Sequence, residues 1–101
     1  ETHRHNADVY RAVDAIAEIK DNPNAYLYLE RGLTYNVSDP QAIVVRETFD
    51  ASASFRRRET IVSNRIISDI QQNDNITNVF IFFGEEHVEN IKTIIEEGLD
   101  A

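Results

Sequence analysis

Two short apolar runs, each followed by charged residues, constrain the fold of this 101-residue chain more than any other feature. Residues 25–29 (AYLYL) and 79–83 (VFIFF) are aromatic or aliphatic throughout, which is typical of strands buried on both faces of a sheet. Patterns with helical spacing lie before, between and after these runs. Strands that alternate with helices form parallel sheets through right-handed crossovers. The sequence therefore predicts an α/β fold, a small parallel sheet flanked by helices.

Periodic apolar residues predict three amphipathic helices. The first begins after the N-cap Asn6, carries apolar residues at three- and four-residue spacing as far as Ile19, and ends at residues 21–23 (DNP). The second covers 55–72, where valine and isoleucine form a stripe. The third covers about 88–99, and Gly98 near its end is expected to act as a C-cap.

Residues 33–54 allow two interpretations. Residues 38–41 (SDPQ) resemble a capping box that opens a helix, whereas residues 43–45 (IVV) favour a strand, and we favour a short helix. Two strands are too few to carry these helices, so we expect a further strand immediately upstream of Glu1, lost by truncation or supplied by another chain. On this interpretation residues 1–101 form a single compact α/β domain, complete or as a fragment of a longer protein.

Composition excludes several functional classes. The formal net charge is −8, from 18 acidic and 10 basic residues, so the average field repels polyanions and predicts no nucleic-acid partner. No run approaches the roughly 20 apolar residues of a membrane-spanning helix, and no signal-peptide pattern opens the chain. The absence of cysteine excludes thiol chemistry. We expect a soluble protein, cytoplasmic or secreted as part of a larger one.

Three polar segments are predicted to meet at one edge of the sheet. They are residues 1–5 (ETHRH) before the first helix, Glu30 after the first run, and residues 84–87 (GEEH) after the second. Ligands of open parallel sheets bind outside the carboxyl ends of the strands, so His3, Glu30 and His87 are candidate site residues. A histidine in the first turn of a helix is favoured as neutral imidazole, the form of a general base or metal ligand.

The same segments resemble a known superfamily. Residues 1–3 (ETH) resemble the end of its GE-x-H motif, Leu29-Glu30 its strand-end glutamate, residues 58–66 (RETIVSNRI) its R-[DE]-x-x-M-A-x-N-I helix, and residues 84–87 its second G-x-x-H motif. These motifs occur in the family's order over residues 1 to about 97. The chain is thus similar to a compact or truncated member of the superfamily that includes Tiki/TraB proteins, erythromycin esterases and ChaN-like proteins.

The resemblance implies catalytic roles for His3, Glu30, Arg58 and His87, and a divalent metal (Mn, Co or Zn) held by His3, Glu30 and His87. It implies a hydrolase that cleaves an ester or amide bond of a small molecule or peptide, with or without the metal. Two alternatives remain open. One is a non-catalytic binding or regulatory module of a larger toxin or effector, associated with itself or with the rest of its parent chain. The other is haem or iron binding.

Overall fold

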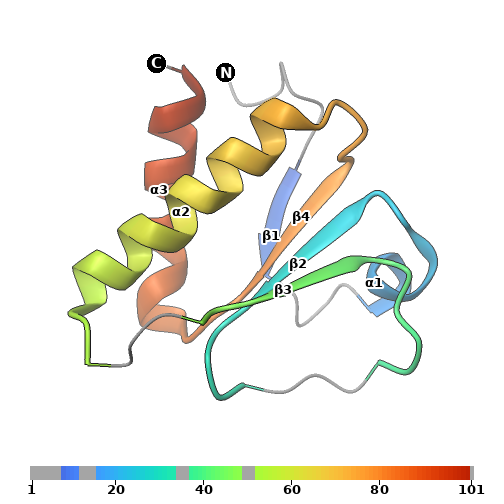
Figure 1. Cartoon of the computed structure of the whole chain (residues 1–101), viewed down its shortest axis with the longest axis horizontal. Coiled ribbons are helices and arrows are strands. Elements are labelled where there is room, and N and C mark those ends of the chain that lie inside the picture. Colours follow the sequence, from blue (N-terminus) through green and yellow to red (C-terminus); the bar gives the residue numbers. More distant parts are fainter. Residues whose placement is uncertain (1–7, 12–15, 34–36, 49–51, 101) are drawn as a thin grey trace.

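A computed structural model describes residues 8–11, 16–33, 37–48 and 52–100 of the chain. The described residues form one sheet of four parallel strands in the order β1-β4-β2-β3 (Figure 1). The strands are β1 (Asp8–Arg11), β2 (Ala25–Leu29), β3 (Ile43–Arg46) and β4 (Asn78–Phe82). The last strand of the sequence therefore lies in the interior of the sheet, between the first and the second.

Helices cover both faces of this sheet. Two long helices, α2 (Phe55–Gln72) and α3 (Glu85–Asp100), pack against each other and against one face, while the short helix α1 (Ile16–Asp21) lies on the other (Figure 1). Ser54 caps α2, because its side-chain oxygen accepts a hydrogen bond from the backbone N–H of Arg57 at 3.2 Å. The α/β fold class predicted from the sequence is confirmed.

Alternate residues of the two central strands enter different cores. Tyr28 and Ile81 are buried beneath α2 and α3, whereas Leu27 and Phe80 are buried on the opposite face near Ile19 of α1. This alternation is the period of two expected for a strand. It explains why both runs are apolar along their whole length, since each strand is covered on both faces.

Three of the sequence-based predictions about secondary structure are wrong. The helix expected after Asn6 is replaced in its first part by β1, and the described helical residues of this segment are Ile16–Asp21. The short helix expected within 33–54 is absent from the described residues there; residues 43–46 form β3, and Asp39 has φ 49°, which no right-handed helix adopts. Gly98 is not a C-cap, because α3 continues to Asp100.

The strands β1 and β3 extend to four described strands the sheet that the sequence analysis left with two. Their parallel pairing with β4 and β2 supplies the backbone hydrogen bonds that a two-stranded sheet would lack. The strand expected upstream of Glu1 stays a prediction, because it would precede the first residue of the sequence.

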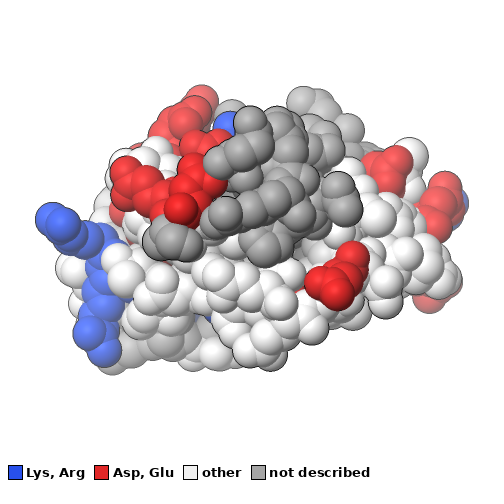
Figure 2. Space-filling model, turned by 90° about the horizontal axis from the view of Figure 1, so that it is seen from above, with Lys and Arg blue, Asp and Glu red and all other residues white. Residues whose placement is uncertain are grey.

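Charge is distributed unevenly over the surface. On the face shown in Figure 2, acidic side chains form several separate groups, and most of the visible basic side chains gather at one end. No continuous basic surface is visible on the described part of this face. None of the described helices is both long enough and apolar enough to cross a membrane.

Candidate active site

Two glutamates follow directly on neighbouring strands at the carboxyl edge of the sheet. Glu30 comes after β2, and its backbone N–H donates to the carbonyl of Phe82 at 2.9 Å. Glu47 comes after β3, and its N–H donates to the carbonyl of Leu29 at 2.8 Å. Because these bonds extend the pairing of the sheet, both glutamates have a fixed backbone position at the edge.

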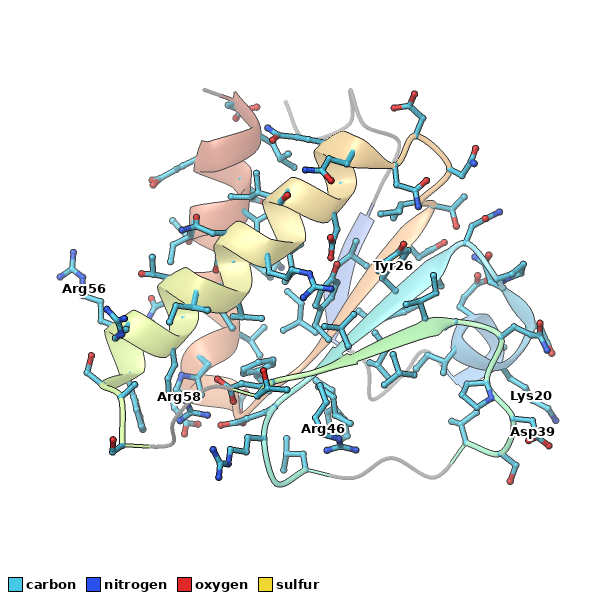
Figure 3. All side chains as sticks on the ribbon, in the orientation of Figure 1. Lys20, Tyr26, Asp39, Arg46, Arg56 and Arg58 are labelled. Atoms are coloured by element: carbon cyan, nitrogen blue, oxygen red, sulfur yellow. The ribbon has the colours of Figure 1, made fainter. Side chains whose placement is uncertain are left out.

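Arg58, the fourth residue of α2, joins the two carboxylates (Figure 3). Its Nη2 lies 2.9 Å from Oε2 of Glu30 and 2.8 Å from Oε1 of Glu47, and its Nε donates to Oε2 of Glu47 at 3.1 Å. The hydrogen bond to Glu47 raises the pKa of Arg58 above its ordinary value; burial acts in the opposite direction, and Glu30 raises the pKa further. Arg58 is therefore a permanently charged bridge.

Backbone N–H groups also bind the same two carboxylates. Oε1 of Glu30 accepts a hydrogen bond from the N–H of Gly84 at 2.6 Å, just before α3 begins. Oε1 of Glu47 accepts one from the N–H of Arg31 at 3.1 Å. Each carboxylate is thus bound by a side chain and by the backbone, which restricts its orientation.

His87 lies in the first turn of α3 and is only 1% exposed. Its Nδ1 is 2.8 Å from Oε2 of Glu59, a buried residue of α2, and its Nε2 is 3.5 Å from Oε2 of Glu30. Asn90 donates a further hydrogen bond to Oε1 of Glu59 at 3.2 Å. The ring of Phe55 packs against the imidazole, with centroids 4.5 Å apart.

The charged groups form one connected chain of contacts, from Glu47 through Arg58, Glu30 and His87 to Glu59. An ionised carboxylate can only accept hydrogen bonds, so the 2.8 Å contact to Glu59 requires a proton on Nδ1 of His87. In the neutral imidazole, Nε2 then carries the lone pair and faces Glu30. This is the tautomer that a general base of the Nε2 type needs.

The structure brings together three of the four site residues expected from the sequence: Glu30, Arg58 and His87. The fourth, His3, lies outside the described residues. Two further members, Glu47 and Glu59, were missed. The signal for Glu47 was the β-branched run before it, which places a strand end there; the signal for Glu59 was its position next to Arg58 in the R-[DE] motif.

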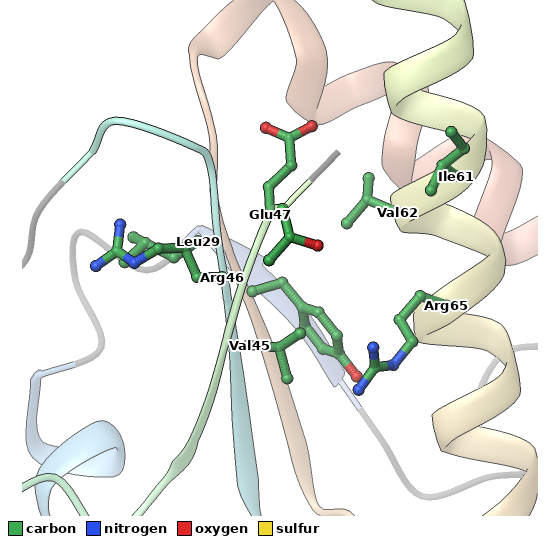
Figure 4. Close-up of a pocket in the computed structure, with 9 residues that line it drawn as sticks. Leu29, Val45, Arg46, Glu47, Ile61, Val62 and Arg65 are labelled. Atoms are coloured by element: carbon green, nitrogen blue, oxygen red, sulfur yellow. The ribbon is translucent and has the colours of Figure 1, made fainter. Parts of the chain in front are cut away.

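One hollow is lined by Glu59 and another by Glu47, the residues at the two ends of this charged chain. A groove of about 550 Å³ lies between α2 and α3, and Glu59 forms part of its wall. A smaller cavity of about 90 Å³ lies between β3 and α2, with Val45 and Val62 on its walls and Glu47 at one end (Figure 4). The groove is large enough for a small ligand, whereas the cavity admits only a few atoms.

The described residues do not form a metal site by themselves, and His3, the third expected ligand, lies outside them. They contain no group of three His, Cys, Asp or Glu side chains able to hold a metal ion. Glu30 and His87, two of the expected ligands, are together, but the guanidinium of Arg58 lies 2.9 Å from the Glu30 oxygen that faces His87.

No protein-family model matches this chain, and no curated protein and no solved structure matches it either. The similarity to the Tiki/TraB, erythromycin-esterase and ChaN-like superfamily therefore rests on the order of the four motifs and stays a prediction.

Proposed function

We propose that this chain is a hydrolase of an ester or amide bond in which His87 is the general base. The observation that carries the proposal is the contact of 2.8 Å between Glu59 and Nδ1 of His87, at the carboxyl edge of a parallel sheet. A buried carboxylate on one imidazole nitrogen orients the ring and stabilises the imidazolium that forms when the other nitrogen takes a proton. The motif resemblance points to the same class of reaction.

The roles of the remaining residues follow from their positions. Water held by Nε2 of His87 and by Glu30 gives a proton to Nε2 and attacks the substrate carbonyl carbon. The positive charge of Arg58 stabilises the negative oxygen of the tetrahedral intermediate. Imidazolium then returns the proton to the leaving group as the bond to it breaks. Glu47 is a positioning residue, because its contact is with Arg58.

The test of this proposal is a substitution that removes the proton-accepting nitrogen of His87 but keeps a hydrogen-bond donor to Glu59. In His87→Asn the side-chain amide can still donate to Glu59, but it has no nitrogen that accepts a proton. We expect hydrolysis of nitrophenyl esters or nitroanilides of small acyl groups to fall by about 100-fold or more. The circular dichroism spectrum should stay that of the parent chain, which excludes unfolding as the cause.

Glu89→Gln is the matched control, because Glu89 is exposed on the same helix. It should retain full activity. Full activity of His87→Asn, or no turnover of any ester or amide by the parent chain, would contradict the proposal.

A second candidate is a non-catalytic binding or regulatory module of a larger toxin or effector. One observation favours it: every buried side-chain nitrogen and oxygen of the described residues has a hydrogen-bond partner. A network that is satisfied internally suits a structural role. Glu30→Gln separates the two candidates. A structural glutamate changes only the free energy of unfolding, whereas the proposed hydrolase also loses kcat measured well below the unfolding temperature.

A further inference from the structure

The strand β3 lies at an edge of the described sheet. Among the described strands its one neighbour is β2, whereas β2 and β4 are each paired on both sides. The N–H of Glu47, directly after β3, donates to the carbonyl of Leu29 in the direction of β2. Because the backbone groups of successive residues in a strand point to opposite sides, the N–H and C=O groups of Val44 and Arg46 point away from β2. They are the groups that an added strand would bind.

Apolar side chains are exposed along this edge. Ile43 of β3 is 45% exposed and Ile61 of α2 is 37% exposed, and they are two of the three large apolar side chains that are exposed among the described residues. Ile43 and Val45 share the face of β3 that is directed toward α2, since side chains alternate along a strand. The cavity of about 90 Å³ between β3 and α2 has Val45, Ile61 and Val62 on its walls. It holds a few atoms, which is the size of the tip of an aliphatic side chain.

The opposite face of β3 carries a positive charge. Arg46 follows Val45 and extends away from α2 (Figure 4). Its Nη1 donates to the carbonyl of Leu33 at 2.7 Å, which is a neutral acceptor, and within the described ranges no carboxylate forms an ion pair with it. Arg58 and Arg65, by contrast, are each paired with a carboxylate. An acidic side chain on an added strand would therefore meet a guanidinium that has no anionic partner among the described residues.

We infer that β3 binds an extended peptide segment of a partner protein as an added strand, and that this segment has the alternating pattern apolar, acidic, apolar. The two apolar side chains lie on the α2 face, against Ile43 and in the cavity beside Val45. The acidic side chain between them lies on the other face, against Arg46. Backbone hydrogen bonds at Val44 and Arg46 supply affinity, and the side-chain contacts supply specificity. This inference does not depend on the proposed hydrolase function.

A second copy of this chain is a poorer occupant of the edge. The sequence of β3 is IVVR, which contains no acidic residue. Pairing of two β3 strands would bring a second Arg46 to the interface and no anion from either strand. The charge complementarity that an acidic peptide supplies is therefore missing in that dimer.

The test uses a synthetic peptide whose sequence is the same in both directions, acetyl-Ser-Thr-Ile-Glu-Ile-Thr-Ser-amide, so that its side-chain pattern suits either strand orientation. Titration into the isotope-labelled chain should shift the backbone amide NMR signals of β3 in a saturable way. Replacing the central glutamate of the peptide with lysine should weaken binding by at least about fivefold. Replacing both isoleucines with glycine should weaken it by about tenfold or more.

Two N-methylated peptides test whether the backbone pairs as a strand. Methyl groups on every second amide block one side of the peptide strand, and the two alternate sets block opposite sides. One set should weaken binding by about tenfold or more, because its amides face β3, while the other set should have little effect. Equal effects of the two sets would contradict strand addition.

Substitutions in the chain test the charge contact. Arg46→Gln should weaken binding of the glutamate peptide by about threefold or more, and Arg46→Glu should make the chain prefer the lysine peptide. Arg57→Gln is the matched control, because Arg57 is an exposed arginine of α2 that does not line the cavity, and it should bind like the parent chain. Thermal unfolding shows whether each variant is folded, and Arg46→Gln, which adds no charge, decides the test if Arg46→Glu does not fold.

Three results would overturn the inference. The first is no saturable shift of the β3 signals, which would also be found if another part of this chain covered the edge. The second is equal binding of the glutamate and lysine peptides by the parent chain. The third is a dimer in sedimentation that the glutamate peptide does not dissociate and whose interface includes β3, which would assign the edge to a second copy. None of these measurements uses turnover, so they are independent of the test of the hydrolase.

Discussion

Oε2 of Glu59 lies 2.8 Å from Nδ1 of His87, and both residues are buried, Glu59 to 6% and His87 to 1% exposure. Glu59 directly follows Arg58 in α2. Two consecutive residues of α2 thus make these contacts: the guanidinium of Arg58 binds Glu30 and Glu47, and the carboxylate of Glu59 binds His87. The position of α2 over the sheet edge therefore determines the whole arrangement.

Replacing Glu59 with glutamine should lower kcat by about 100-fold or more, because an amide neither stabilises imidazolium nor fixes the Nδ1–H tautomer as a carboxylate does. KM should change little. Initial rates at saturating ester concentration measure the effect, and Glu96→Gln, an exposed glutamate of α3, is the control. Unchanged kcat in Glu59→Gln would show that the contact with His87 is structural.

Arg58→Ala should destabilise the fold by about 3–5 kcal/mol, because it leaves the carboxylates of Glu30 and Glu47 close together and without their cation. Arg57→Ala, at the exposed neighbouring position, should stay within about 0.5 kcal/mol of the parent chain. Arg58→Lys should restore only part of the loss, since an ammonium cannot reproduce the forked contact with Glu47. Urea denaturation measures the free energy of unfolding of the three variants. An equal loss of stability in Arg57→Ala and Arg58→Ala would refute the bridging role of Arg58.

A side chain at position 98 of α3 should destabilise the fold because it would clash with Ile67. A Cβ at position 98 would overlap Cδ1 of Ile67 on α2. Gly98→Ala should therefore lower the free energy of unfolding by about 1 kcal/mol, although alanine is the better helix former. In an Ile67→Val background, which lacks Cδ1, the same change should instead raise it by several tenths of a kcal/mol. Urea denaturation of the parent chain, the two single variants and the double variant tests this prediction. If Gly98→Ala changes the free energy of unfolding with the same sign whether residue 67 is Ile or Val, the prediction is contradicted.

Stability should fall at alkaline pH through Tyr28. Burial, and then the hydrogen bond from its hydroxyl to Asp69 at 2.6 Å, raise the pKa of Tyr28 above the ordinary value of 10.0. Because the folded pKa exceeds the unfolded one, the stabilisation is complete below pH 10 and is lost as pH rises above it. The free energy of unfolding of the parent chain should therefore decline more steeply between pH 9 and 11 than that of Tyr28→Phe. Parallel pH profiles would exclude this linkage.

Much of the fold was predictable because its strongest signals are local. The stripe over 55–72 corresponds to α2, and the runs 25–29 and 79–83 correspond to β2 and β4, the second within one residue. The edge strands were harder. The segment that forms β1 has neighbours at helical spacing, and its strand form depends on pairing with β4, a contact about 70 residues away in sequence. Local periodicity carries no information about such a partner.

The sequence predicted the site residues that follow a recognised strand, and missed those whose position depends on other elements. Glu30 and His87 follow the two recognised strands, so parallel topology places them at the same edge. Glu47 was missed because residues 38–41 were interpreted as a helix start, whereas Asp39 turns the chain with a left-handed φ and lets the β-branched residues pair with β2. The role of Glu59 depends on how α2 faces α3, which only tertiary packing decides.

The strand order has a consequence for how the protein is made. Since β4 pairs with both β1 and β2, a nascent chain that has left the ribosome only as far as α2 has no continuous sheet among the described strands. In such a chain Glu30 also lacks the Gly84 N–H, and Glu59 lacks its imidazole partner. Synthesis of β4 and α3 therefore has to precede assembly of both the sheet and the charged edge.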